Sequence, residues 1–159
     1  MRHQTLFHYL LGLSPDEKVL RTAMAPAPDD ATCYFLHKGH IMEYVKIGRD
    51  GKKLPTLFFG PGEFIIPAHT EYSSLIQLDD TKITAFARRL IIGTLRQYPA
   101  SANHYRAFRQ RYHEKVAARI HTLETMTGSE RFQHLQTTQA WVLELAEKVD
   151  IIAYLQWER

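Results

Sequence analysis

Between residues 32 and 86 the chain alternates short apolar runs with turn signals, and this pattern constrains its fold more than any other feature. Lys38-Gly39, Asp50-Gly51 and Pro61-Gly62 mark three of the turns. Glycine adopts positive φ without steric cost, and Asp-Gly is a strong signal for a tight hairpin. Short strands separated by turns every 8–12 residues or so are typical of a barrel or jelly roll. We therefore expect an antiparallel β-roll of about eight short strands.

Helical patterns flank this β segment. Residues 3–24 carry apolar side chains at helical spacing, and Ser14-Pro15-Asp16-Glu17 has the pattern of a helix start with Ser14 as N-cap. From about Arg88 a second helical pattern begins, and Pro99 interrupts it. The α+β class follows, with helices before and after the β-roll.

A long helix from about residue 100 carries an apolar stripe that steps by three or four residues. The stripe consists of Tyr105, Phe108, Tyr112, Val116, Ile120 and Leu123. The basic side chains Arg106, Arg109, Arg111, Lys115 and Arg119 are assigned to the opposite face. Thr127-Gly128-Ser129 is predicted to end this helix and cap the next, whose inner face carries Phe132, Leu135, Trp141, Val142 and Leu145. Asp150 is predicted to cap a last short helix over 151–155.

Composition limits the class of protein. The chain has 159 residues and is 45% hydrophobic, enough for one core with a small appendage. No apolar run approaches the roughly 18–20 residues that span a bilayer. The single cysteine, Cys33, excludes an intrachain disulfide and favours a cytoplasmic protein. Residues 88–123 carry eight basic side chains and one acidic, whereas residues 124–159 carry three basic and six acidic.

The order of these segments resembles the Crp/Fnr family of transcription regulators, whose sensor is a cyclic-nucleotide-binding domain, and most of all its divergent Bacteroidetes-type members. The resemblance rests on YFLHKGHIMEYV, the Asp-Gly hairpin, GPGEF, the long helix, SERFQHL and IIAYL, and covers the chain from about Leu6 to Leu155. It implies a cyclic-nucleotide-binding-like β-roll (a double-stranded β-helix or jelly roll) with a long dimerisation helix and a short C-terminal helical region. Residues 1–123 would form the sensor domain, and residues 124–159 the helical remnant of a helix-turn-helix domain.

The resemblance also implies a ligand site. In the family, a glycine-rich turn and an arginine bind the cyclic phosphate, and a glutamate accepts from the ribose hydroxyl. Gly62 and Glu63 match the Gly-Glu pair and Phe64 the apolar position after it, whereas Tyr72 stands where the arginine would be and Ser73 at the adjacent small hydroxyl. Without a bidentate guanidinium, cyclic AMP binding should weaken by roughly 10- to 150-fold. Gly62 could also be an ordinary turn residue, and Glu63 a solvated carboxylate.

The stripe of the long helix corresponds to the dimer seam of the family. We therefore expect a homodimer paired through Phe108, Tyr112, Val116, Ile120 and Leu123. Ile152-Ala153-Tyr154-Leu155 resembles the first helix of the family's helix-turn-helix, but only four residues follow it, with Gln156 in place of the turn glycine. A recognition helix needs about three turns, so DNA binding through this motif is not expected for the chain as given.

Three functions remain open. The leading hypothesis is a ligand-sensing regulatory protein with a degenerate cyclic-nucleotide site, which is not an enzyme and has no metal or assigned cofactor, although a small-molecule effector could replace the cyclic nucleotide. The second is a transcription regulator whose basic segment 88–123 contacts DNA backbone. The third is a small cupin-like metal enzyme built on His37, His40 and His69, which lack the His-x-His spacing of such sites.

Overall fold

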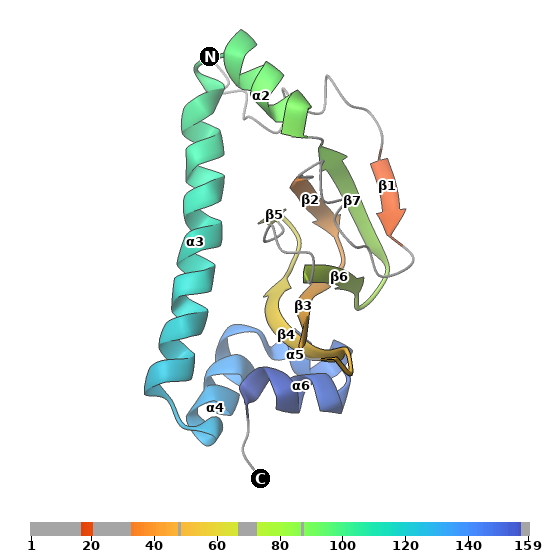
Figure 1. The fold of residues 1–159 in the computed structure, drawn as a ribbon, viewed down its shortest axis with the longest axis vertical. Coiled ribbons are helices and arrows are strands. Elements are labelled where there is room, and N and C mark those ends of the chain that lie inside the picture. Colours follow the sequence, from red (N-terminus) through yellow and green to blue (C-terminus); the bar gives the residue numbers. More distant parts are fainter. Residues whose placement is uncertain (1–16, 21–32, 48, 67–72, 87, 157–159) are drawn as a thin grey trace.

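The computed structural model describes residues 17–20, 33–47, 49–66, 73–86 and 88–156, which form two antiparallel sheets followed by helices (Figure 1). One sheet has four strands in the order β1-β7-β2-β5, and the other has three in the order β4-β3-β6. The strands are β1 (Glu17–Leu20), β2 (Cys33–Lys38), β3 (Ile41–Ile47), β4 (Lys52–Phe59), β5 (Phe64–Ile65), β6 (Ser73–Gln77) and β7 (Thr81–Phe86). The expected antiparallel β-roll is therefore confirmed.

Two of the predicted turns require glycine for different reasons. Gly51 closes the hairpin between β3 and β4 with a φ of 63°, and open space surrounds it. Gly39 has a φ of 82°, and a Cβ there would lie 2.6 Å from the backbone oxygen of Asp80. The β2–β3 turn therefore excludes other residues by both conformation and space.

The predicted helix over residues 3–24 is wrong at Glu17–Leu20, which forms β1 instead. This strand pairs with β7, Glu17 opposite Thr84 and Leu20 opposite Thr81. β7 uses its other edge for β2, so β1 satisfies backbone groups that would otherwise be left unpaired. Long-range pairing thus overrides the local helix signal at Ser14–Glu17. The rest of the predicted helical lead-in lies outside the described residues.

The helical half agrees with the sequence pattern except after Thr127, where the single predicted helix is two helices divided at Gln139. Its helices are α2 (Arg88–Gln97), α3 (Ser101–Thr125), α4 (Gly128–Thr138), α5 (Ala140–Leu145) and α6 (Lys148–Leu155). Pro99 separates α2 from α3, and Thr127 caps α4 in a capping box with Glu130. The predicted role of Asp150 is wrong, because α6 begins at Lys148, three residues before the predicted start, with Glu147 as its N-cap, and Asp150 lies inside the first turn.

The three-stranded sheet is buried on both faces, and this positions the helices that follow. Side chains alternate along β4, so Leu57 and Phe59 enter the core between the two sheets while Phe58 points the other way. Phe58 and Met42 pack in a second cluster with residues of α4–α6, namely Leu135, Val142 and Leu155. Figure 1 shows α3 running beside the β-roll and α4–α6 lying below β3 and β4.

Candidate functional site

The predicted ligand-binding turn joins β4 to β5 and is fixed to β2 by backbone hydrogen bonds. The amide of Gly62 donates to the carbonyl of Leu36 over 2.7 Å, and the amide of Leu36 donates to the carbonyl of Glu63 over 3.0 Å. Gly62 has a φ of 86°, which favours glycine at this position. Phe64 follows as a buried residue of β5, opposite Phe35. The sequence thus holds Gly62, Glu63 and Phe64 in one rigid turn.

The carboxylate of Glu63 points toward α3 and is engaged at both oxygens. Its Oε2 accepts from the amide of Gly60 over 2.6 Å, and its Oε1 lies 2.5 Å from Nζ of Lys115. The same ammonium lies 4.6 Å from the centre of the Phe59 ring, a cation–π distance. Glu63 is therefore not a free surface carboxylate but one half of an ion pair between the β-roll and the long helix.

A cavity of about 70 Å³ separates this turn from α3. Drug-sized ligands occupy pockets of roughly 300–1,000 Å³. The residues around it are Phe59, Gly62, Glu63, Phe64, Phe108, Arg111, Tyr112 and Lys115. This cavity is smaller than such pockets, and Lys115 already occupies one carboxylate oxygen of Glu63.

The structure tests the other two predicted ligand residues, Tyr72 and Ser73, less directly. Tyr72 lies outside the described residues. Ser73 begins β6, where its backbone pairs with Val45 of β3. The structure thus brings Gly62, Glu63 and Phe64 together, and the roles of Tyr72 and Ser73 stay predictions.

The sequence pattern missed Lys115 as a member of this site. It assigned Lys115 and Arg119 to the face opposite the apolar stripe, and this is wrong, because both side chains contact the rest of the chain. The inward face of a helix is more than about 100° wide, and long basic side chains lay their stems along apolar surface. One sequence feature could have indicated that Lys115 lies on the inward face. Arg111, Lys115 and Arg119 are spaced four residues apart, next to Tyr112 and Val116 of the apolar stripe.

The predicted dimer stripe lies largely against the β-roll of its own chain. Phe108 stacks on Phe64 with ring centres 4.9 Å apart, and Tyr112 lies parallel to Phe59 at 6.3 Å. Burial raises the pKa of the Tyr112 hydroxyl, and the charge of Glu43 raises it further.

The rest of that stripe packs less completely. Val116 also packs on the core between the sheets, and Leu123 is half-buried, whereas Ile120 is 50% exposed. Pairing of two chains through this stripe stays a prediction, and of its five residues Ile120 is the most available to a partner.

The two histidines in the described part of the metal-site alternative have separate protein partners. Nε2 of His37 lies 2.7 Å from the hydroxyl of Thr84, whereas Nδ1 of His40 lies 2.7 Å from the carboxylate of Asp79. His69 lies outside the described residues. No group of three or more potential metal ligands occurs within the part of the chain that the structure describes. Among those same residues, no helix is long and apolar enough to cross a membrane.

The architecture is that of a cyclic-nucleotide-binding-like β-roll with a long helix beside it. No family model matches the sequence, and no curated protein matches it either. Solved structures do match. The structure of FixK2 from Bradyrhizobium japonicum superposes with a TM-score of 0.71 at 17% identity, covering 89% of this chain and 77% of that one.

Two further neighbours have the same architecture. One is a protein from Eubacterium rectale assigned to the Crp/Fnr family of transcriptional regulators, with a TM-score of 0.68, 10% identity, and coverage of 98% of this chain and 78% of that one. The other is a cyclic nucleotide-binding domain containing protein from Listeria monocytogenes, with a TM-score of 0.65, 9% identity, and coverage of 90% and 76%. The Crp/Fnr-like fold expected from the sequence is thus confirmed.

Proposed function

We propose that this chain is a cytoplasmic ligand-sensing regulatory protein of the Crp/Fnr type and not an enzyme. Residues 1–123 would act as the sensor, with α3 as its output helix, and residues 124–159 would correspond to helices related to a helix-turn-helix DNA-binding domain. The fold and its regulatory neighbours support this assignment. The observation that carries it is the ion pair between Glu63 of the ligand turn and Lys115 of α3.

This ion pair offers a physical route from ligand binding to the helices. A ligand that donates a hydrogen bond to Glu63 would compete with Lys115 for the same oxygen, because Oε2 is already occupied by Gly60. Release of Lys115 would loosen α3 from the β4–β5 turn. Since α3 leads directly into α4, ligand binding would change how the helical region is held.

The ligand itself is proposed to differ from cyclic AMP. Lys115 supplies one positive charge near Glu63, which the sequence pattern had not placed there. A lysine is a single point charge, however, and does not replace the bidentate guanidinium that is missing at Tyr72. We therefore keep the expectation that cyclic AMP and cyclic GMP bind in the high micromolar range or not at all, and that the natural effector is less anionic.

Calorimetry and native mass spectrometry together test this proposal. Native mass spectrometry of the purified protein should show a co-purifying small molecule, and Glu63→Gln should release it. Titration with cyclic AMP should give only weak heat. Low-micromolar binding of cyclic AMP would contradict the degenerate site, whereas a bound metal without any small molecule would support the cupin-like enzyme.

The second function, direct DNA binding through the basic segment, is tested separately. A gel-shift titration with salt would show a steep loss of affinity if several phosphates are neutralised. Of the eight basic residues in that segment, Lys115 and Arg119 already contact groups within the chain, which weakens this alternative.

A further inference from the structure

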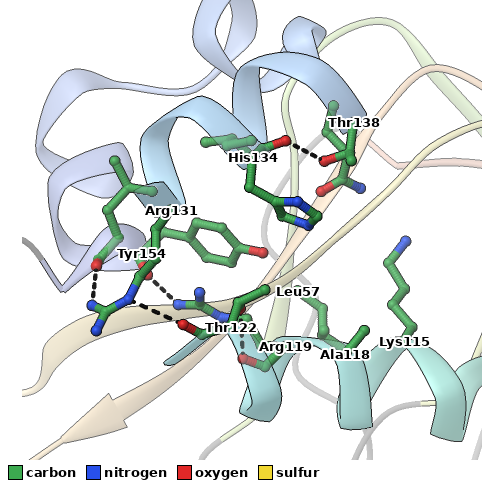
Figure 2. Close-up of a pocket in the computed structure, with 12 residues that line it drawn as sticks. Leu57, Lys115, Ala118, Arg119, Thr122, Arg131, His134, Thr138 and Tyr154 are labelled. Atoms are coloured by element: carbon green, nitrogen blue, oxygen red, sulfur yellow. Dashed lines mark hydrogen bonds between the residues drawn. The ribbon is translucent and has the colours of Figure 1, made fainter. Parts of the chain in front are cut away.

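A second cavity lies away from the ligand turn, where α3 meets the C-terminal helices. It has a volume of about 240 Å³, is open to solvent on one side, and is lined by residues of α3, α4, α6 and β4 (Figure 2). Its lining combines apolar side chains with basic and neutral polar ones. They are Leu57, Lys115, Ala118, Arg119, Thr122, Arg131, His134, Leu135, Thr138, Gln139, Tyr154 and Leu155.

Two guanidinium groups dominate the charge of this cavity. Arg131 of α4 donates to the carbonyls of Thr122 and Leu123 at the end of α3, and to that of Leu155 at the end of α6. Arg119 of α3 stacks on the ring of Tyr154 with its Cζ 3.7 Å from the ring centre, and it donates to the Tyr154 carbonyl. Every one of these acceptors is a neutral backbone carbonyl.

The described lining of this cavity holds no carboxylate beside these positive charges. Among the described residues that line the cavity there are four basic or imidazole side chains and no aspartate or glutamate. Burial lowers the pKa of Arg119, an effect that Tyr154 partly offsets and that the neighbouring charge of Arg131 reinforces. Two like charges held close together in a half-buried site, with no carboxylate among the described lining residues, favour an anion that can enter.

We propose that this cavity binds a small oxyanion, a carboxylate or phosphate carried on a short apolar body. The guanidinium of Arg119 would pair with the oxyanion, since its two parallel N–H donors fit a carboxylate or a phosphate. The positive charge of Arg131 would attract the same oxyanion electrostatically. Leu57, Ala118 and Leu135 provide the apolar wall. The volume is below that of common nucleotide-sized pockets, so the ligand is a compact metabolite rather than a dinucleotide.

The site is separate from the ligand turn, yet one residue belongs to both. Lys115 lines the small cavity beside Glu63 as well as this larger one. Figure 2 shows the Lys115 side chain on the same α3 face as Ala118 and Arg119. An anion in the larger cavity would attract the Lys115 ammonium and weaken its pairing with Glu63, which makes the second site a natural modulator of the first.

Calorimetric titration with inorganic phosphate and, in a parallel arm, with butyrate tests the proposal at constant ionic strength. We expect saturable binding of at least one of them; the two arms identify which oxyanion the cavity prefers. Arg119→Gln should weaken that binding by about tenfold or more. Ala118→Phe, which fills the cavity without removing a charge, should abolish it. Arg106→Gln is the matched control, because Arg106 is an exposed arginine of the same helix whose side chain donates a hydrogen bond to Asn103.

The outcomes are distinct. Loss of binding in Arg119→Gln and Ala118→Phe, with Arg106→Gln unchanged, supports the site. Ala118→Phe decides the matter if Arg119→Gln fails to fold. Absence of saturable binding to either probe, or equal weakening by Arg106→Gln, overturns the proposal, as does binding that survives in the filled variant. Binding only to a DNA duplex, with neither small oxyanion, would assign the charges to nucleic acid and likewise overturn it.

Discussion

The ion pair between Glu63 and Lys115 should contribute measurably to stability. A hydrogen bond to a charged group is worth about 1.5–3 kcal/mol when shielded. The Glu63 side chain is 37% exposed and that of Lys115 is 21% exposed, so solvent screening reduces this to about 1 kcal/mol. Lys115→Met keeps the aliphatic stem but also loses the cation–π contact with Phe59, worth roughly 0.5–1 kcal/mol. We expect a total loss of about 1–2 kcal/mol, or roughly 2–8 °C in Tm for a chain of this size.

A double-mutant cycle of Lys115→Met and Glu63→Gln in urea isolates the pair itself. We expect a coupling of about 1 kcal/mol, since each single change removes the same interaction. Lys148→Met is the control, because Lys148 is an exposed lysine of α6 and its replacement alters the net charge equally. A coupling below about 0.3 kcal/mol would refute the reasoning, because it is within the error expected for independent sites.

Three further outcomes follow from particular residues. Gly39→Ala should lower the free energy of unfolding by ~2 kcal/mol or more, whereas Gly62→Ala, which meets no atom within 4 Å, should lose only about 1 kcal/mol; urea denaturation compares them directly. Ile120→Asp should dissociate a homodimer in a sedimentation experiment without lowering Tm. A dimer that stays intact would contradict the predicted interface at Ile120 and place the dimer contact on another surface. Burial raises the pKa of the Cys33 thiol, so this thiol should resist a thiol reagent at pH 8 until urea unfolds the chain, and rapid native labelling would contradict its burial.

The β-roll and the main helices could be predicted from the sequence because their signals are local. Turn glycines, a proline break and the Thr127 capping box act over a few residues, and tertiary contacts reinforce them. The strand at Glu17–Leu20 could not be predicted in this way. Its conformation depends on β7, more than sixty residues later, whose unpaired edge no local pattern reveals.

The candidate site likewise contains residues that local sequence could predict and residues that only tertiary packing brings there. Gly62, Glu63 and Phe64 were predicted from a short motif that resembles the family's Gly-Glu pair, and because they are adjacent in the chain they form one turn. Lys115 reaches that turn from 52 positions away, and only the packing of α3 on the β-roll decides which oxygen it meets. The arginine cavity was missed for a related reason, because Arg119 and Arg131 come from different helices that meet only after α4 folds back on α3.

Lys115 connects the two sites through simple electrostatics. Its single ammonium has one strong partner, Glu63, and faces a cavity that holds Arg119 and Arg131 without an acid among its described lining residues. An anion bound there would offer Lys115 a second partner, so pairing with Glu63 would weaken while the β4–β5 turn gains a free carboxylate oxygen. Because linkage is reciprocal, a ligand that takes Glu63 would in turn strengthen anion binding beside Arg119 by the same factor. The α3 helix would therefore report on two small molecules through one side chain.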